Sequence, residues 1–132
     1  MAKRVGPVAR SERPERKRLP DTRRSITRKL KFTYAESDGS VREARLYAVV
    51  GFYEDGRPGE LFIHMDRVGS LIHGLLDALA VTTSIGLQYG VPLSACVEKW
   101  RHTRFEPAGR GASSVIDLVA SWLEQFVVGE ER

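Results

Sequence analysis

The spacing of apolar residues changes once along the chain, and this change limits the folds that are open to it. From Leu30 to Met65, apolar residues alternate with polar ones, which is typical of strands with one buried face. From Gly69 onward they recur three and four positions apart, as on one side of a helix. A strand-rich first half followed by a helical second half predicts an α+β fold.

The first half of the chain predicts a small antiparallel meander of three strands. Leu30–Tyr34 alternates between apolar and polar residues, and the turn signal Asp38-Gly39 follows it. Ala44–Tyr53 is apolar on both faces toward its end, which favours a central strand. The turn-forming residues 54–59 come next, and Leu61–Met65 is expected to return antiparallel to its neighbour. The sheet is therefore expected to run from Leu30 to Met65.

The second half predicts about three helices that pack on the sheet. The longest is expected at Gly69–Tyr89, ended by residues 90–92, and a short one at Leu93–Trp100. The last is expected at Ser114–Phe126, with a serine cap and Asp117 reaching back to the start of the helix. The buried stripe expected on the longest helix consists of Ile72, Leu75, Leu76, Leu79, Thr83 and Leu87.

Charge divides the chain into a basic N-terminal part and an acidic remainder. Residues 1–31 hold 12 Lys and Arg against 3 Asp and Glu, a net charge of +9, and the other residues hold 9 against 14, a net charge of −5. With its prolines and few large apolar residues, the start of the chain cannot bury enough surface to fold. We therefore expect a disordered basic tail at residues 1–19 and one domain at residues 20–132.

The tail has charge enough to bind the phosphates of a nucleic acid, with a strong dependence on salt. It lacks the interleaved aromatic residues that stack on bases, so it would bind without sequence preference. A solvated tail and a protein-docking arm are the alternatives.

A single cysteine, Cys96, excludes an internal disulfide and a cysteine-rich zinc site, and favours a reducing compartment, the cytoplasm. The first residues of the chain lack the apolar stretch of a secretory signal. The most apolar segment, Leu71–Leu87, is interrupted by polar residues that include Asp77. We therefore expect this segment to be a buried helix of a soluble domain, and we expect no membrane partner.

The residues show no evident set of catalytic groups or metal ligands. The histidines lie on separate predicted elements, and the spacing of His73 and Asp77 is more typical of a structural pair than of a catalytic one. Cys96 is expected to be a small core residue rather than a nucleophile. The hydroxyl groups of residues 82–84 are expected to bond to carbonyls one turn earlier, with ligand binding as the alternative.

The loop before the last helix is the strongest candidate for a binding site. Its glycines give the backbone freedom just before a helix N-terminus, where outward-pointing N–H groups suit an anion. Arginine side chains and serine hydroxyls could add hydrogen bonds to a phosphate. The alternative is that the serines cap the helix and the glycines turn the chain, and Asp117 is expected to hold the cap. The candidate phosphate or nucleotide contacts are Arg104, Gly109, Arg110, Gly111, Ser113 and Ser114, with supporting charge from Arg23, Arg24 and Lys29.

Five stretches of the chain together form a recognisable pattern: Leu19–Lys29, Val50–Ile63, Ser84–Pro92, Arg104–Pro107 and Ser113–Asp117. On these stretches the chain resembles, from Leu19 to Leu123, the TSCPD family, the domain at the C-terminus of adenosylcobalamin-dependent (class II) ribonucleotide reductases. Where that family has the Thr-Ser-Cys-Pro-Asp run that names it, this chain reads Ala112–Asp117, with serine for cysteine and no proline. Thiol chemistry is therefore not carried over to this position. The initiating Met1 and the charged end Gly129–Arg132 favour a short stand-alone chain.

The resemblance implies a role in deoxyribonucleotide or nucleic-acid metabolism. Ribonucleotide reduction needs a radical-forming cysteine, a redox-active cysteine pair and a large barrel, which a chain of 132 residues with one cysteine lacks. We therefore expect a non-catalytic accessory or regulatory module that binds a nucleotide, a nucleic acid or a partner protein. The alternatives are a separately encoded part of a ribonucleoside-diphosphate reductase and nucleic-acid binding through the basic tail. Adenosylcobalamin is expected only through a reductase partner, and a homo-oligomer stays open.

Overall fold

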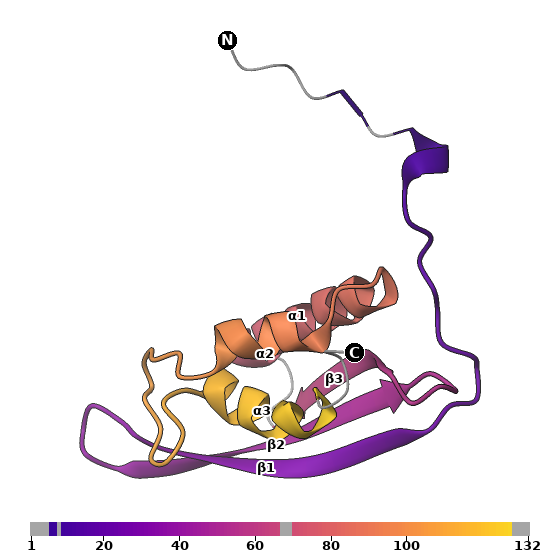
Figure 1. Cartoon of the computed structure of the whole chain (residues 1–132). Helices are drawn as coiled ribbons and strands as arrows, with labels where there is room; N and C mark the ends of the chain where they lie inside the picture. The colour runs from indigo at the N-terminus through magenta and orange to yellow at the C-terminus, as the bar shows by residue number, and fades with distance from the viewer. Residues whose placement is uncertain (1–5, 8, 67–69, 128–132) are drawn as a thin grey trace.

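The computed structural model describes residues 6–7, 9–66 and 70–127. Within these ranges a three-stranded sheet is followed by three α-helices, which is the α+β fold that the sequence predicts (Figure 1). The elements in chain order are η1 (Arg10–Glu12), β1 (Ser25–Ala35), β2 (Val41–Phe52), β3 (Pro58–Met65), α1 (Leu71–Gln88), α2 (Leu93–Trp100), α3 (Val115–Leu123) and η2 (Glu124–Phe126).

The sheet is an antiparallel meander in the order β1-β2-β3, so β2 is the central strand, as predicted. The prediction that the sheet begins at Leu30 is wrong, because β1 begins at Ser25, which pairs with Gly51. The first five residues of β1 are all exposed, so no alternation of buried and exposed residues marks them as a strand. Backbone pairing with β2 extends the strand instead. β3 likewise begins at Pro58, three residues before the predicted start.

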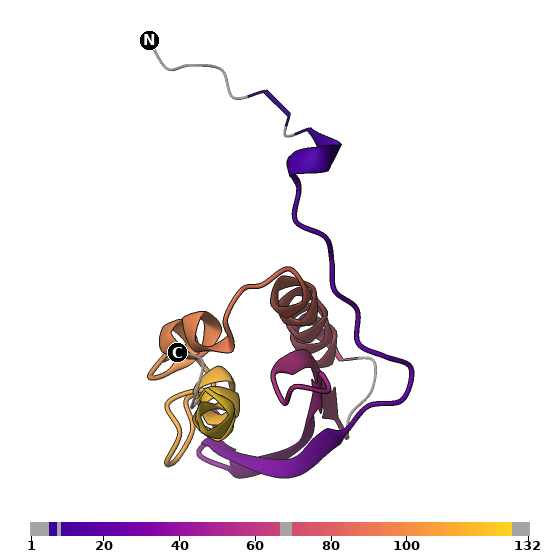
Figure 2. The same cartoon turned by 45° about the vertical axis from the view of Figure 1, so that its right-hand side comes forward.

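All three α-helices lie on one face of the sheet, and no described element covers the other face (Figures 1 and 2). The core lies between these two layers. α1 packs along β3, and α3 packs near β1. The side chains that fill the core with less than 2% exposure are mostly aliphatic; the largest are Leu46, Leu61, Ile63, Leu93, Leu123, Val50 and Val119.

The helices of the second half follow the predicted segments closely. α2 has the predicted bounds. The last helix was predicted at Ser114–Phe126, and α3 with η2 spans Val115 to Phe126, with Ser114 as the N-cap. α1 begins at Leu71, where the hydroxyl of Ser70 accepts a hydrogen bond from the N–H of His73. The predicted first residue of that helix, Gly69, lies outside the described residues.

The buried face of α1 differs from the predicted one most clearly at Leu75, while Ile72 and Leu79 are half-buried. Leu75 was expected in the buried stripe, but it is 61% exposed, whereas Ala80 is buried. The face that contacts β3 consists of Leu76, Ala80, Thr83 and Leu87, so Leu75 lies on the side that points away from the sheet. By length and composition α1 would pass for a membrane span, which is weak evidence because the core helix of a soluble domain passes the same test.

Residues 9–15 lie away from the rest of the domain (Figures 1 and 2). The chain contacts the domain from Arg16 onward. From Arg16 to Arg24 the chain lies against the turn between β2 and β3 and against the end of α1. We call residues 16–24 the N-terminal strap. The boundary predicted between a tail at residues 1–19 and a domain at residues 20–132 stays a prediction.

Candidate functional site

The N-terminal strap is attached to the domain through Gln88, the last residue of α1. The carbonyl of Gln88 accepts a hydrogen bond from the N–H of Lys17 at 2.8 Å, and its side-chain oxygen accepts one from Arg16 at 2.7 Å. The side-chain amide of Gln88 donates in turn to the carbonyl of Gly59 at 3.0 Å. One buried glutamine therefore links the strap, the helix and the start of β3.

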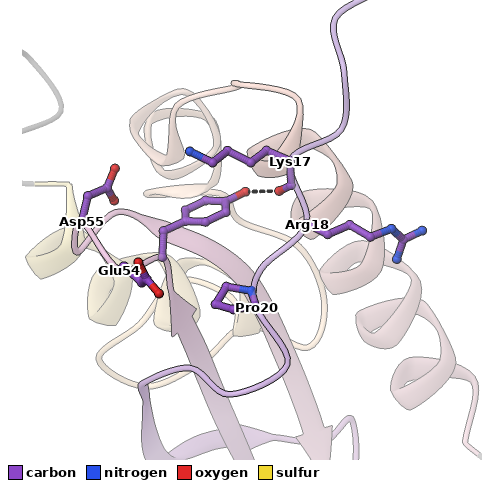
Figure 3. Close-up of a pocket in the computed structure, with 6 residues that line it drawn as sticks. Lys17, Arg18, Pro20, Glu54 and Asp55 are labelled. Atoms are coloured by element: carbon purple, nitrogen blue, oxygen red, sulfur yellow. Dashed lines mark hydrogen bonds between the residues drawn. The ribbon is translucent and has the colours of Figure 1, made fainter.

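Tyr53 holds the strap from the other side. Its hydroxyl donates to the carbonyl of Lys17 at 2.5 Å (Figure 3). The Lys17 ammonium and the Arg57 guanidinium lie 5.5 and 5.1 Å from the centre of its ring. Burial raises the pKa of Tyr53, so the hydroxyl stays protonated and remains a donor at neutral pH. A shallow pocket of about 420 Å³ lies here, lined by Lys17, Arg18, Pro20, Tyr53, Glu54 and Asp55.

A paired salt bridge fixes the end of the strap to the sheet. The guanidinium of Arg23 donates to the two carboxylate oxygens of Glu60 at 2.6 and 2.7 Å. Glu60 is buried in β3, opposite Gly51 of β2, and a Cβ at Gly51 would overlap the Glu60 carboxylate. The hydrogen bond to Glu60 raises the pKa of Arg23. Arg23 was predicted to lend positive charge to a ligand site. In the structure its charge is neutralised by the carboxylate of Glu60.

The loop between α2 and α3 closes on the carboxylate of Asp117. One oxygen accepts hydrogen bonds from the Arg101 guanidinium at 2.5 Å and from the N–H of His102 at 2.7 Å. The other oxygen accepts one from the N–H of Ser113 at 2.9 Å. The hydroxyl of Ser114 accepts the N–H of Asp117, so the prediction that Asp117 holds the cap is confirmed.

This network determines where the predicted serine contacts lie. Ser114 is fully buried, and its hydroxyl is shared between the N–H of Asp117 and the hydroxyl of Thr103 at 2.9 Å. Ser113 is half-buried and gives its backbone N–H to Asp117. The carboxylate of Asp117 thus takes a place at the helix N-terminus that suits an anion. Phosphate binding by this loop stays a prediction, and the hydroxyl of Ser114 is engaged within the protein.

The rest of the loop is attached to β1. Gly109 forms an isolated bridge with Tyr34, and the N–H of Arg110 donates to the carbonyl of Thr33 at 2.8 Å. A Cβ at Gly109 would overlap the ring of Phe32, so glycine is required by this close approach. Gly111 has a φ of 89°, in the left-handed region. The side chains of Arg104 and Arg110 are exposed.

The other candidate residues lie apart from this loop. Arg24 and Lys29 are exposed, at the end of the strap and in β1. Thr83 donates to the carbonyl of Leu79, as predicted for a hydroxyl within a helix. Ser84 also contacts the backbone of Leu61 in β3, a link between helix and sheet that the sequence did not indicate. Within residues 6–7, 9–66 and 70–127, no group of three or more His, Cys, Asp or Glu is placed to hold a metal ion.

Sequence reasoning missed the residues that hold the strap and the loop in place. Tyr53, Glu60 and Arg101 form their main contacts with groups 36, 37 and 16 residues away. The sequence did contain one sign that Glu60 has a partner, because it is a charged residue in an apolar strand. A buried carboxylate requires a cation or several hydrogen-bond donors. The partner could not be found from spacing, since the strap has several arginines.

The fold and these contacts define a small α+β domain with an N-terminal strap held by ion pairs and hydrogen bonds. The model of the TSCPD domain family matches residues 7–127, and the chain belongs to this family. It is 48% identical over 118 residues to a vitamin B12-dependent ribonucleotide reductase of Rhodopirellula baltica (strain DSM 10527 / NCIMB 13988 / SH1), with 84% of this chain covered. It is 40% identical over 114 residues to one of Streptomyces coelicolor, and 37% over 125 residues to one of Bradyrhizobium diazoefficiens.

The chain spans about a tenth of the length of these relatives: 10%, 11% and 9%. The similarity is therefore to one region of each reductase. No solved structure shows a significant match to the chain.

The names of these relatives refer to vitamin B12, and a cobalamin needs a deep and mainly apolar cleft that encloses most of its large macrocycle. The pockets around the strap and beside Phe62 measure about 370 to 420 Å³ and are open to solvent, and three or more charged side chains line each of them. These pockets do not fit the cofactor.

Proposed function

We propose that the chain is a non-catalytic accessory module of a vitamin B12-dependent ribonucleotide reductase and that it binds the reductase polypeptide through the outer side of α1. The observation that carries this proposal is an apolar stripe on α1 that no described residue covers. The stripe comprises Leu71, Leu75, Ala78, Thr82 and Ile85 of the helix and Tyr89 at its C-cap, and we call it the α1 stripe.

The spacing of the α1 stripe supports a helix-binding surface. Its members follow one another at intervals of four, three, four, three and four residues, the spacing of the contact positions in helix pairs. Leu71 and Leu75 are 81% and 61% exposed, although each would gain about 1.5–3 kcal/mol from full burial. Small side chains at Ala78 and Thr82 leave room for a partner to approach closely. Continuous exposed apolar surface of this kind marks an interaction site.

The charge of α1 also favours a protein partner. Asp77 is the sole Asp, Glu, Lys or Arg in the 18 residues of the helix. The basic residues lie mainly in the first 31 positions, on other parts of the molecule. The α1 stripe therefore offers apolar contact and little electrostatic steering, which suits a persistent protein interface.

The reductase is the partner that the relatives support. In each of the three relatives above, the similar region is part of a polypeptide about ten times as long as the match. A domain that is covalently attached to a large enzyme packs against it or moves relative to it. An uncovered apolar helix on the same domain is a surface through which such packing would occur. The single cysteine of this chain supports an accessory role over a catalytic one.

Reductase turnover tests this function. The purified chain is added at increasing concentration to the vitamin B12-dependent ribonucleotide reductase of the same organism, and the rate of deoxyribonucleotide formation is measured with and without nucleoside triphosphate effectors. We expect a saturable change in rate or in effector response. A rate and an effector response that stay constant at saturating chain would contradict the accessory role.

Matched variants connect that effect to the α1 stripe. Leu75→Asp places a charge in the middle of the stripe, and Val41→Asp makes the same kind of change at an exposed valine of β2. Leu75→Asp is expected to abolish the effect on turnover, and Val41→Asp is expected to retain it. Equal loss in both variants would assign the effect to general destabilisation and not to the stripe.

A further inference from the structure

The face of the sheet turned away from the helices is open (Figure 1). The alternation of side chains along each strand determines which residues lie on it, and the strand register places them in rows. One row is Thr27, Val49 and Phe62, and the next is Lys29, Tyr47 and His64. We call this surface the outer sheet face; it consists of Thr27, Lys29, Lys31, Arg45, Tyr47, Val49, Phe62 and His64.

Three rings lie next to one another on the outer sheet face. Tyr47 and Phe62 are 41% and 38% exposed, and Phe62 is stacked on His64 with ring centroids 6.1 Å apart and ring planes 11° apart. His64 is the cross-strand partner of Tyr47, so Tyr47 and Phe62 are diagonal neighbours on adjacent strands. Their exposed surfaces are therefore available to flat ligands.

Positive charge surrounds these rings. Lys29 pairs with Tyr47 across β1 and β2, and Lys31 pairs with Arg45. Neither lysine forms an ion pair or a side-chain hydrogen bond with any residue that the structure describes. Arg45 has a single weak contact, with Glu43 at 3.4 Å, in which both side chains are largely exposed.

The carboxylates on this side of the sheet are few or already paired. Glu60, at one end of the face, is neutralised by Arg23, and Asp21 also lines the pocket beside Phe62 at that end. Glu43 lies beyond Arg45 at the other end. The charge on and near the outer sheet face thus complements a polyanion.

We propose that the outer sheet face binds single-stranded nucleic acid, with bases stacked on Tyr47 and Phe62 and phosphates contacted by Lys29, Lys31 and Arg45. Aromatic rings with interleaved cations on an open sheet recognise a strand whose bases are unstacked and accessible. A duplex keeps its bases stacked inside, so it would use the lysines and leave the rings without partners. This inference uses a different face from the reductase contact and stands independently of it.

The test is binding of the full-length chain to a fluorescein-labelled 20-nucleotide DNA strand, its RNA equivalent and its duplex, by fluorescence anisotropy at fixed salt. Single strands are expected to bind more tightly than the duplex. Tyr47→Ala and Phe62→Ala are each expected to weaken single-strand binding by about 5- to 150-fold, equivalent to about 1–3 kcal/mol. The matched control Phe105→Ala removes an exposed ring from another surface and is expected to leave the affinity unchanged.

The charged residues are tested through the salt dependence. Lys29→Gln and Lys31→Gln are each expected to reduce the slope of log K against log salt by about 0.7, whereas Lys99→Gln on α2 is expected to leave it unchanged. Equal affinity for strand and duplex, or unchanged affinity in both aromatic variants, would overturn the proposal. A loss confined to Arg13→Gln and Arg18→Gln would assign binding to the N-terminal segment and would overturn it as well.

Discussion

The guanidinium of Arg101 donates a hydrogen bond to the carboxylate of Asp117 at 2.5 Å, and this pair joins the end of α2 to the first turn of α3. Arg101 also contacts Glu124 at 2.6 Å, at the other end of α3. One arginine therefore spans the length of that helix. The side chain of Asp117 is 5% exposed. The cost of burying its carboxylate is offset by the hydrogen bonds that it accepts from Arg101, His102 and Ser113.

Asp117→Asn is expected to lower the free energy of unfolding by about 1.5–3 kcal/mol, because hydrogen bonds to a charged acceptor are replaced by weaker ones. Asp77→Asn, on the exposed side of α1, is the matched control and is expected to change stability little. Urea unfolding of both variants measures the difference. Equal stability of wild type and Asp117→Asn would show that the carboxylate does not hold the loop.

The contribution of Asp117 should depend on pH. Burial alone would raise the pKa of Asp117, but the N–H groups of His102 and Ser113 and the guanidinium of Arg101 together hold it below its ordinary value. Such a carboxylate stabilises the fold fully above its unfolded pKa, about 3.9, and the stabilisation is lost as the pH falls through the folded pKa. The stability gap between wild type and Asp117→Asn should be constant near neutral pH and shrink below about pH 4. A gap that widens on acidification would contradict this.

The two glycines Gly51 and Gly74 should respond to alanine in opposite directions. A Cβ at Gly51 would overlap the Glu60 carboxylate, which Arg23 holds in place, whereas nothing lies within 4 Å of a Cβ at Gly74 in α1. Gly51→Ala is therefore expected to destabilise the protein, and Gly74→Ala to stabilise it by about 0.5–1 kcal/mol. The thermal unfolding midpoint should fall for Gly51→Ala and rise for Gly74→Ala. A neutral Gly51→Ala would mean that Glu60 can move at little cost.

Tyr53→Phe is expected to loosen the N-terminal strap while leaving the core intact. The substitution removes the hydrogen bond from the tyrosine hydroxyl to the carbonyl of Lys17, worth about 0.5–1.5 kcal/mol, and keeps the ring under Lys17 and Arg57. Hydrogen exchange at the N–H of Lys17, which bonds to Gln88, should become faster. Exchange in β2 should stay unchanged, and unaltered exchange at Lys17 would show that Gln88 alone holds the strap.

The sequence predicted the elements in which apolar residues recur at regular spacing. It did not predict the parts of the fold in which exposed strand residues or a second apolar helix face hide that spacing. α2 was predicted with its bounds because Pro92 begins it and its apolar spacing is regular. The first part of β1 was missed because Ser25–Lys29 extend past the helices and are exposed on both faces. Leu75 was predicted to be buried because α1 is apolar on two sides, and the sequence does not tell which of these sides packs on β3.

The candidate site was less accessible to sequence reasoning than the fold. The glycines and serines of the loop were correctly singled out as special, since Gly109 approaches Phe32 and Ser114 caps α3. Their internal contacts depend on partners in β1 and after α2, which only the folded chain brings together. The outer sheet face was missed for the same reason. Tyr47 and Phe62 are 15 positions apart and become neighbours only through the register of β2 and β3.

Docking of the α1 stripe on the reductase is measured by the dissociation constant between this chain and the vitamin B12-dependent reductase of the same organism. Isothermal titration calorimetry should give a measurable constant for the wild-type chain, with a value at least about tenfold weaker for Leu75→Asp and unchanged for Val41→Asp. Absence of binding by the wild-type chain, or equal affinity for Leu75→Asp and the wild type, would contradict docking through the α1 stripe. Sedimentation of the chain as a dimer that Leu75→Asp dissociates would instead identify a second copy as the partner of this surface.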